Sequence, residues 1–193
     1  FQPTTKQQLI DAVTAFTSGG DANVYYNVPI NDWDTSLITD MSSLFQDKST
    51  FNSNISDWDV SSVSNMEAMF SGANDFNQPL NDWDVSSVTK MRNMFLRARN
   101  FNQSLNDWDV SNVNNMRNMF DSANAFNGDI NSWTLRSSGL SMQEMFKSAS
   151  VFNVDITTWD TSGVTTMQDM FKNATAFDQD IQYWKTNHSS FNN

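Results

Sequence analysis

The chain has 193 residues, a formal net charge of −11 from 22 acidic and 11 basic residues, and no cysteine. This charge disfavours nucleic acids and anionic membrane surfaces as partners, and the lack of cysteine excludes disulfides. Aromatic residues make up 13% of the chain, so a sizeable core is available and disorder is not expected. Because no apolar run approaches the roughly 20 residues of a membrane span, direct membrane insertion is not expected either. The first residue is Phe1 rather than Met, so we expect a processed product or a fragment of a longer protein.

Residues 1–20 differ from the rest of the chain and predict an N-terminal capping helix. Thr5 and Gln8 have the spacing of a capping box. The apolar residues that follow share one helix face: Leu9, Ile10, Val13 and Phe16. An array of repeats exposes an apolar cross-section at its end, which such a helix would cover. A partner-binding helix is the alternative.

Residues 21–185 restate one motif about every 25 residues. One ladder consists of Trp33, Trp58, Trp83, Trp108, Trp133, Trp159 and Trp184. Further ladders consist of Met41, Met66, Met91, Met116, Met142 and Met167, and of Phe45, Phe70, Phe95, Phe120, Phe146 and Phe171. A last one consists of Phe51, Phe76, Phe101, Phe126, Phe152 and Phe177, with Tyr26 at its first position. A fixed period of this length predicts a solenoid with these ladders as its core.

Each repeat is expected to hold one short parallel strand and one short helix. In the third unit, Trp83, Asp84 and Val85 alternate as a half-buried strand, with Trp83 and Val85 pointing inward. The apolar spacing from Val88 to Ala98 predicts a helix of about three turns. We therefore expect one α/β solenoid domain of about six full units, leucine-rich-repeat-like in architecture. Its predicted parts are the cap at 1–20, the repeats at 21–185 and a C-terminal cap or tail at 186–193.

Two local features qualify this pattern. The segment after Trp133 is one residue longer than its equivalents, which predicts a bulge between strand and helix. Asparagines recur beside the aromatic ladder, at Asn52, Asn77, Asn102, Asn127 and Asn153. We interpret them as side chains that hydrogen-bond along the stack and satisfy the turn backbone, in preference to a ligand role.

Aspartates flank the tryptophans in four successive units: Asp32 and Asp34, Asp57 and Asp59, Asp82 and Asp84, Asp107 and Asp109. If the tryptophan points inward, both of its neighbours point outward on one face, which Thr158 and Asp160 continue. Carboxylates about 4.8 Å apart repel by about 1 kcal/mol in water. Compensation by cations such as calcium, by a basic partner, by solvent or by backbone N–H groups is therefore expected. The second aspartate of each pair suits an Asx role, so the first column is the better candidate recognition face.

Basic residues gather on the predicted helix side: Lys90, Arg92, Arg97, Arg99, Arg117, Lys147 and Lys172. This asymmetry indicates either solvated surface, which we favour, or a surface for side-by-side self-association.

The spacing L-x-x-W-x-V resembles the L-x-x-L-x-L core of leucine-rich repeats. More specifically, the units that read FNQPLNDWDVSSVTKMRNMF resemble the BspA-like leucine-rich repeat family, carried by many surface proteins of bacteria and microbial eukaryotes. The resemblance implies a parallel-strand solenoid on a cell surface, usually within a larger protein. It also implies binding or adhesion as the general function, and no known catalytic residues.

Catalysis is not expected, because the chain has one histidine, His188, and no nucleophile–base set, phosphate loop or zinc spacing. A catalytic carboxylate pair is normally unique, whereas Asp-Trp-Asp occurs four times. We expect a non-catalytic, acidic, extracellular or cell-surface module without a cofactor, which binds a protein or glycan partner through the acidic face. The alternative is a structural subunit or spacer that packs against neighbouring subunits of an extracellular fibre, coat or other assembly.

Overall fold

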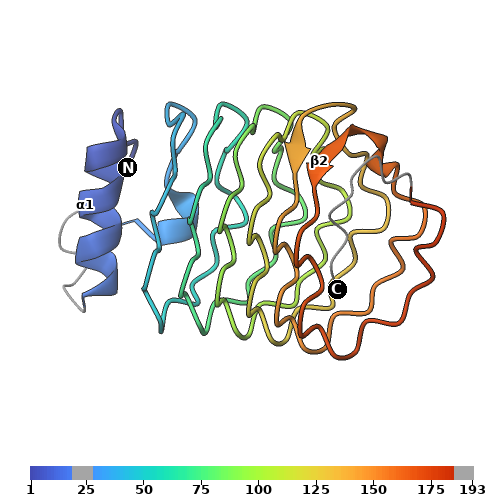
Figure 1. The fold of residues 1–193 in the computed structure, drawn as a ribbon. Coiled ribbons are helices and arrows are strands. Elements are labelled where there is room, and N and C mark those ends of the chain that lie inside the picture. The colour runs from blue at the N-terminus through green and yellow to red at the C-terminus, as the bar shows by residue number, and fades with distance from the viewer. Residues whose placement is uncertain (19–27, 185–193) are drawn as a thin grey trace.

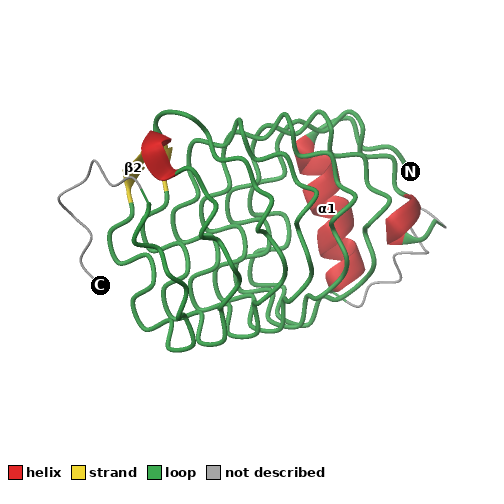
Figure 2. Cartoon of the chain, turned by 90° about the vertical axis from the view of Figure 1, so that its right-hand side faces the viewer, coloured by secondary structure: helices red, strands yellow, loops and turns green. Residues whose placement is uncertain are grey.

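The chain forms a row of similar coils with one helix at its N-terminal end, in a computed structural model that describes residues 1–18 and 28–184 (Figure 1). The helices are α1 (Lys6–Thr17) and the 3-10 turns η1 (Ile30–Asp32) and η2 (Thr161–Gly163), and the strands are β1 (Leu140–Ser141) and β2 (Val164–Thr166). β1 and β2 pair in parallel. Figure 2 shows how small a part of the described chain these elements occupy. None of the described helices has the length and apolar character needed to cross a membrane.

The helix α1 lies against the first coil. Its N-cap is Thr5, whose hydroxyl accepts a 3.3 Å hydrogen bond from the N–H of Gln8. Leu9, Ala12 and Val13 are buried on the face toward the coils. On the polar side, the Lys6 ammonium lies 2.9 Å from a carboxylate oxygen of Asp40. These contacts put α1 where a cap over the first coil was expected.

Consecutive coils are joined by parallel backbone hydrogen bonds along one wall, which we call the ladder wall. It consists of residues 40–47, 65–72, 90–97, 115–122, 141–148 and 166–173. In the third coil, alternate N–H groups, those of Met91, Asn93, Phe95 and Arg97, donate to carbonyls of the next coil at 2.8–2.9 Å. The wall therefore works as a parallel ladder although most of it is too irregular to be a strand.

The ladder wall consists of successive turns, which differs from the short helix expected in each repeat. The intervening N–H groups do not join coils. Those of Met94, Leu96 and Ala98 each donate to the carbonyl three residues earlier in the same coil, which closes a turn. Asn93 and Arg97 have a left-handed φ of 58°. A helix would pair its interior N–H groups within the segment, leaving none to join the coils.

The expected strand also differs in position. Within the described residues of the third coil, the parallel bridge lies at Lys90 and not at Trp83 or Val85. The inward and outward alternation is nevertheless as predicted, since Trp83 and Val85 are buried and Asp84 is exposed.

The predicted ladders form the core. All seven ladder tryptophans are buried, with 2–5% of their surface exposed. Equivalent phenylalanines of neighbouring coils stack, as in Phe70 and Phe95, whose ring centroids are 5.4 Å apart. The two phenylalanines of one coil also stack, as in Phe95 and Phe101 at 4.1 Å. These rings, together with the buried methionines, valines and leucines, form the apolar surface that each coil hides against its neighbours.

The asparagine ladder is confirmed as a structural feature. The side-chain oxygen of Asn52 accepts the N–H of Asn77 at 2.9 Å, and that of Asn77 accepts the N–H of Asn102 at 2.9 Å. The amide side chain of Gln103 also donates to the oxygen of Asn77 at 2.9 Å. The series continues through Asn127 and Asn153. These bonds satisfy turn N–H groups that no backbone carbonyl reaches.

The turn after Trp133, which was predicted to bulge, ends at β1, where Leu140 pairs with Val164 and Ser141 with Thr166, so this register shift adds a residue on the β2 side. Gly139 has a φ of 76° in this turn. The next coil accommodates the extra residue with Gly163, where an added Cβ would lie 2.3 Å from the backbone oxygen of Arg136. The extra residue thus fits because its neighbour lacks a side chain.

Three expectations lie outside the described residues: the role of Tyr26 as the first aromatic position, the cap or tail at 186–193, and the place of His188.

Candidate functional site

The candidate site is the acidic edge, the set of ten residues predicted as a binding face. All ten are exposed: Asp32, Asp34, Asp57, Asp59, Asp82, Asp84, Asp107, Asp109, Thr158 and Asp160. They lie beside the buried tryptophans of successive coils, as the alternation predicted. The coils therefore present carboxylates to solvent along a shared edge.

The second aspartate of each pair is held within its own coil. One carboxylate oxygen of Asp84 accepts the N–H of Ser86 at 3.0 Å and its hydroxyl at 2.6 Å. Asp34 makes the same two bonds with Ser36, and Asp59 makes them with Ser61. Asp109 accepts the N–H of Ser111, and Asp160 accepts the N–H of Ser162. The expected Asx role is therefore confirmed for this column. The Ser86 hydroxyl, and then its N–H, lowers the pKa of Asp84, so the carboxylate stays ionised.

The first aspartate is held by the preceding coil in two places. The side-chain amide of Asn31 donates to Asp57 at 2.6 Å, and its oxygen accepts the N–H of Asp57 at 3.2 Å. Asn81 and Asp107 form the same reciprocal pair. In these two places, an asparagine immediately before one Asp-Trp-Asp thus clamps the first carboxylate of the next coil. This clamp was not among the compensations proposed from the sequence.

Asp82 differs, because Ser56 stands where the clamping asparagine would be. The Ser56 hydroxyl bonds instead to Asp57 in its own coil, at 3.3 Å. Within residues 1–18 and 28–184, the Asp82 carboxylate makes no hydrogen bond or ion pair. It is therefore the carboxylate in the middle of the edge that is most open to a partner.

A depression of about 420 Å³ opens where the acidic pairs give way to hydroxyl residues. It is lined by Asn106, Asp107, Trp108, Asp109, Ser111, Ser132 and Thr134. Asn106 holds Ser132 in place within the depression. The side-chain oxygen of Asn106 accepts the N–H of Ser132 at 2.9 Å, and the backbone carbonyl of Asn106 accepts the Ser132 hydroxyl at 2.8 Å. Ser132 and Thr134 stand here in place of the two aspartates, so hydroxyl groups replace carboxylates on this side of the depression.

Calcium was one of the ligands considered for the acidic edge. Among the residues that the structure describes, no three His, Cys, Asp or Glu side chains come together in a way that could hold a metal ion. The amide and hydroxyl partners of Asp57, Asp84 and Asp107 already supply part of the compensation that calcium was invoked for.

The comparisons with known proteins give one match. The model of the family described as "Mycoplasma protein of unknown function, DUF285" matches residues 13–133 and 104–192. The chain belongs to this family. The two matched stretches overlap, as expected for a repeated motif. No curated protein and no solved structure matches the chain.

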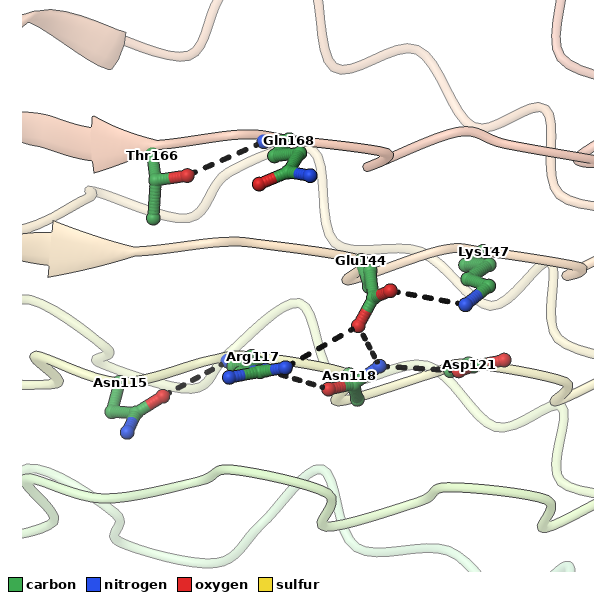
Figure 3. Close-up of polar contacts among 8 residues, drawn as sticks. All are labelled: Asn115, Arg117, Asn118, Asp121, Glu144, Lys147, Thr166 and Gln168. Atoms are coloured by element: carbon green, nitrogen blue, oxygen red, sulfur yellow. Dashed lines mark hydrogen bonds and ion pairs between the residues drawn. The ribbon is translucent and has the colours of Figure 1, made fainter. Parts of the chain in front are cut away.

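A second polar cluster of this DUF285 chain, on the ladder wall, was not predicted. Glu144 lies 3.0 Å from the Lys147 ammonium, 3.8 Å from the Arg117 guanidinium and 2.9 Å from the Asn118 amide (Figure 3). Asn118 also donates to Asp121 at 3.1 Å. Asn118 first, and then Lys147, lowers the pKa of Glu144, while Glu144 raises the pKa of Lys147. The residues come from two coils, so only the spacing of 26 residues between Asn118 and Glu144 could have indicated the contact.

Proposed function

We propose that this chain is a leucine-rich-repeat-like solenoid of the BspA-like type that acts as a non-catalytic binding module outside the cell. Its proposed partner is a protein or glycan that docks on the acidic edge. The supporting observation is the rim of the 420 Å³ depression, where Asp107 is clamped by Asn81 and Asp109 by Ser111. Side chains ordered before binding lose little conformational entropy when a partner arrives.

The chemistry of this edge favours a partner rich in hydrogen-bond donors. Carboxylates accept paired donors, such as adjacent sugar hydroxyls or arginine and lysine side chains. Large exposed apolar side chains are few among the described residues, namely Leu37, Val151 and Tyr183, and none of them lines the depression. A polar, shallow contact of this kind fits a glycan or a basic protein surface better than an apolar anchor.

The test is charge reversal along the edge. Binding of the full chain would be screened on a glycan array and on immobilised basic extracellular proteins, and then repeated with the triple variant Asp57→Lys, Asp82→Lys and Asp107→Lys. The matched control reverses three exposed acids that do not belong to the acidic edge: Asp11, Asp75 and Asp180. The proposal expects at least about tenfold weaker capture by the edge variant alone, in line with several lost charge-assisted bonds. Unchanged capture by a folded edge variant contradicts it.

A structural role in an assembly is the second candidate, supported by the last described coil. Within residues 28–184, the ladder N–H groups of Met167, Asp169, Phe171 and Asn173 have no acceptor, whereas their equivalents in earlier coils donate to the next coil. An edge of this type accepts a further strand-like segment. Light scattering over a wide concentration range tests this role, because a chain that remains monomeric throughout would contradict it.

A further inference from the structure

The third coil carries four cations on its outer surface, which we call the basic strip: Lys90, Arg92, Arg97 and Arg99. All four side chains are exposed. Among the described residues, none of them makes an ion pair or a side-chain hydrogen bond. In a chain of net charge −11, four unpaired cations within ten residues are a marked local exception.

The later coils of the same wall neutralise their own cations. Arg117 and Lys147 share Glu144, and Lys172 lies 3.5 Å from Asp169. The acids nearest to the basic strip do not act in this way. Asp75 accepts the amide of Asn100 at 3.3 Å, and Asp121 accepts Asn118 and Ser122. Glu67, at the position equivalent to Arg92 in the preceding coil, forms no ion pair. The basic strip is thus available to an external anion.

The surroundings of the strip are rich in amides. Lys90 is bridged on one side to Asn65 and on the other to Asn115. The oxygens of these two asparagines accept N–H groups of Glu67 and Arg117, at 3.1 Å each. Their amide nitrogens make no hydrogen bond within the described residues, and Figure 3 shows that of Asn115 turned away from its contact with Arg117. They can therefore donate to hydroxyl or acidic oxygens of a ligand.

We propose that the basic strip binds an anionic polysaccharide that carries sulfate or carboxylate groups. Three of the four cations are arginines, whose planar forks suit such oxyanions. The flanking amides suit sugar hydroxyls, and no exposed large apolar side chain lies on the strip to anchor a folded protein. Charges that lie farther from a ligand than the Debye length of about 8–10 Å at moderate salt are largely screened, so the strip governs contacts at bonding distance.

The test measures the binding of fluorescently labelled dextran sulfate and hyaluronate to the full chain by anisotropy, at low and at physiological salt. The strip variant is Arg92→Gln with Arg97→Gln. The control, Lys147→Gln with Lys172→Gln, removes the same charge from the same wall at cations that already have acidic partners. We expect saturable, salt-sensitive binding of at least one polysaccharide, weakened about tenfold in the strip variant and less than about twofold in the control.

Three results would overturn the proposal: no saturable binding of either polysaccharide, equal losses in both variants, or tighter binding of polyglutamate or duplex DNA at matched charge. The last would assign the strip to a different class of polyanion. Circular dichroism checks folding, and Lys90→Gln with Arg99→Gln replaces the strip variant if that one unfolds. Because the basic strip and the acidic edge share no residue, loss of polysaccharide binding with intact binding at the acidic edge separates this inference from the proposed function.

Discussion

The indole Nε1 of Trp108 donates a 2.8 Å hydrogen bond to the carbonyl oxygen of Leu80 in the preceding coil. Five other ladder tryptophans bond in the same way: Trp58, Trp83, Trp133, Trp159 and Trp184. The backbone ladder of the described coils runs along the ladder wall and not beside the acidic edge. Beside the edge, the buried indole hydrogen bonds connect one coil to the next. The tryptophan thus contributes both apolar area and a fixed spacing between coils.

Replacing Trp108 separates these two contributions. Trp108→Phe should lower the free energy of unfolding by about 1 kcal/mol, because the Leu80 carbonyl still accepts the N–H of Trp83. Trp108→Ala should cost about 3–5 kcal/mol through the cavity it leaves. Urea unfolding measures both values. Tyr183→Phe, at an 82% exposed position, is the control. A Trp108→Phe variant as stable as the native chain would count against the coupling role of the indole.

The left-handed positions of the ladder wall give a second prediction. Ala68 has a φ of 55°, which an L-residue adopts at a cost of about 1–2 kcal/mol, so Ala68→Gly should stabilise the fold slightly. At the next such position, Gly72→Ala should destabilise it, because the added Cβ would lie 2.4 Å from a carboxylate oxygen of Asp47. Thermal melting of the two variants should show shifts of opposite sign. Shifts of the same sign would argue against this backbone geometry.

The two glycines at the bulge distinguish strain from crowding. Gly139→Ala meets no atom within 4 Å and should cost only the left-handed strain, about 1–2 kcal/mol. Gly163→Ala would press against the backbone of Arg136 and Ser137 and should cost more, about 2–3 kcal/mol. Chemical denaturation of both variants checks the order. A larger loss of stability for Gly139→Ala than for Gly163→Ala would show that the backbone of Arg136 and Ser137 does not pack against Gly163.

Acid should weaken the ladder wall through Glu144. Its pKa is lowered in the folded chain by Asn118 and then by Lys147, so its stabilising contribution is present above the ordinary glutamate pKa of about 4.3 and is lost as pH falls through the folded value. Glu144→Gln should cost about 0.5–1 kcal/mol at neutral pH, and this difference should shrink as the pH falls below the ordinary glutamate pKa and through the lowered pKa of the folded chain. Melting temperature against pH measures this. Asn118→Ala should flatten the profile in the same direction, and a constant difference at all pH values would contradict the account.

The core and the exposed edge followed from the sequence because both rest on side-chain periodicity. Trp83 and Phe95 recur at a spacing that only a stack of equivalent units can bury together. The alternation around Trp83 then fixed the outward direction of Asp82 and Asp84, which the structure confirms.

The expected helices were not found because their periodicity is ambiguous. Val88, Met91, Met94, Phe95 and Ala98 fit a helix stripe, but successive turns place the same residues inward. The deciding left-handed residues include Arg97 and Ala68, whose side chains give no sign of a positive φ. The clamp of Asn81 on Asp107 was missed for a related reason, since it depends on the stacking geometry and not on a local motif.

Amide hydrogen exchange followed by NMR shows whether the coils join through the ladder wall and leave the acidic edge open to a partner. The account predicts slow exchange at Met91, Asn93, Phe95 and Arg97, which donate to the next coil, and fast exchange at Asp82 and Asp84. It also predicts non-helical carbon shifts across residues 88–98. Uninterrupted protection of residues 88–98 with helical shifts, or slow exchange at Asp82 and Asp84, would contradict it.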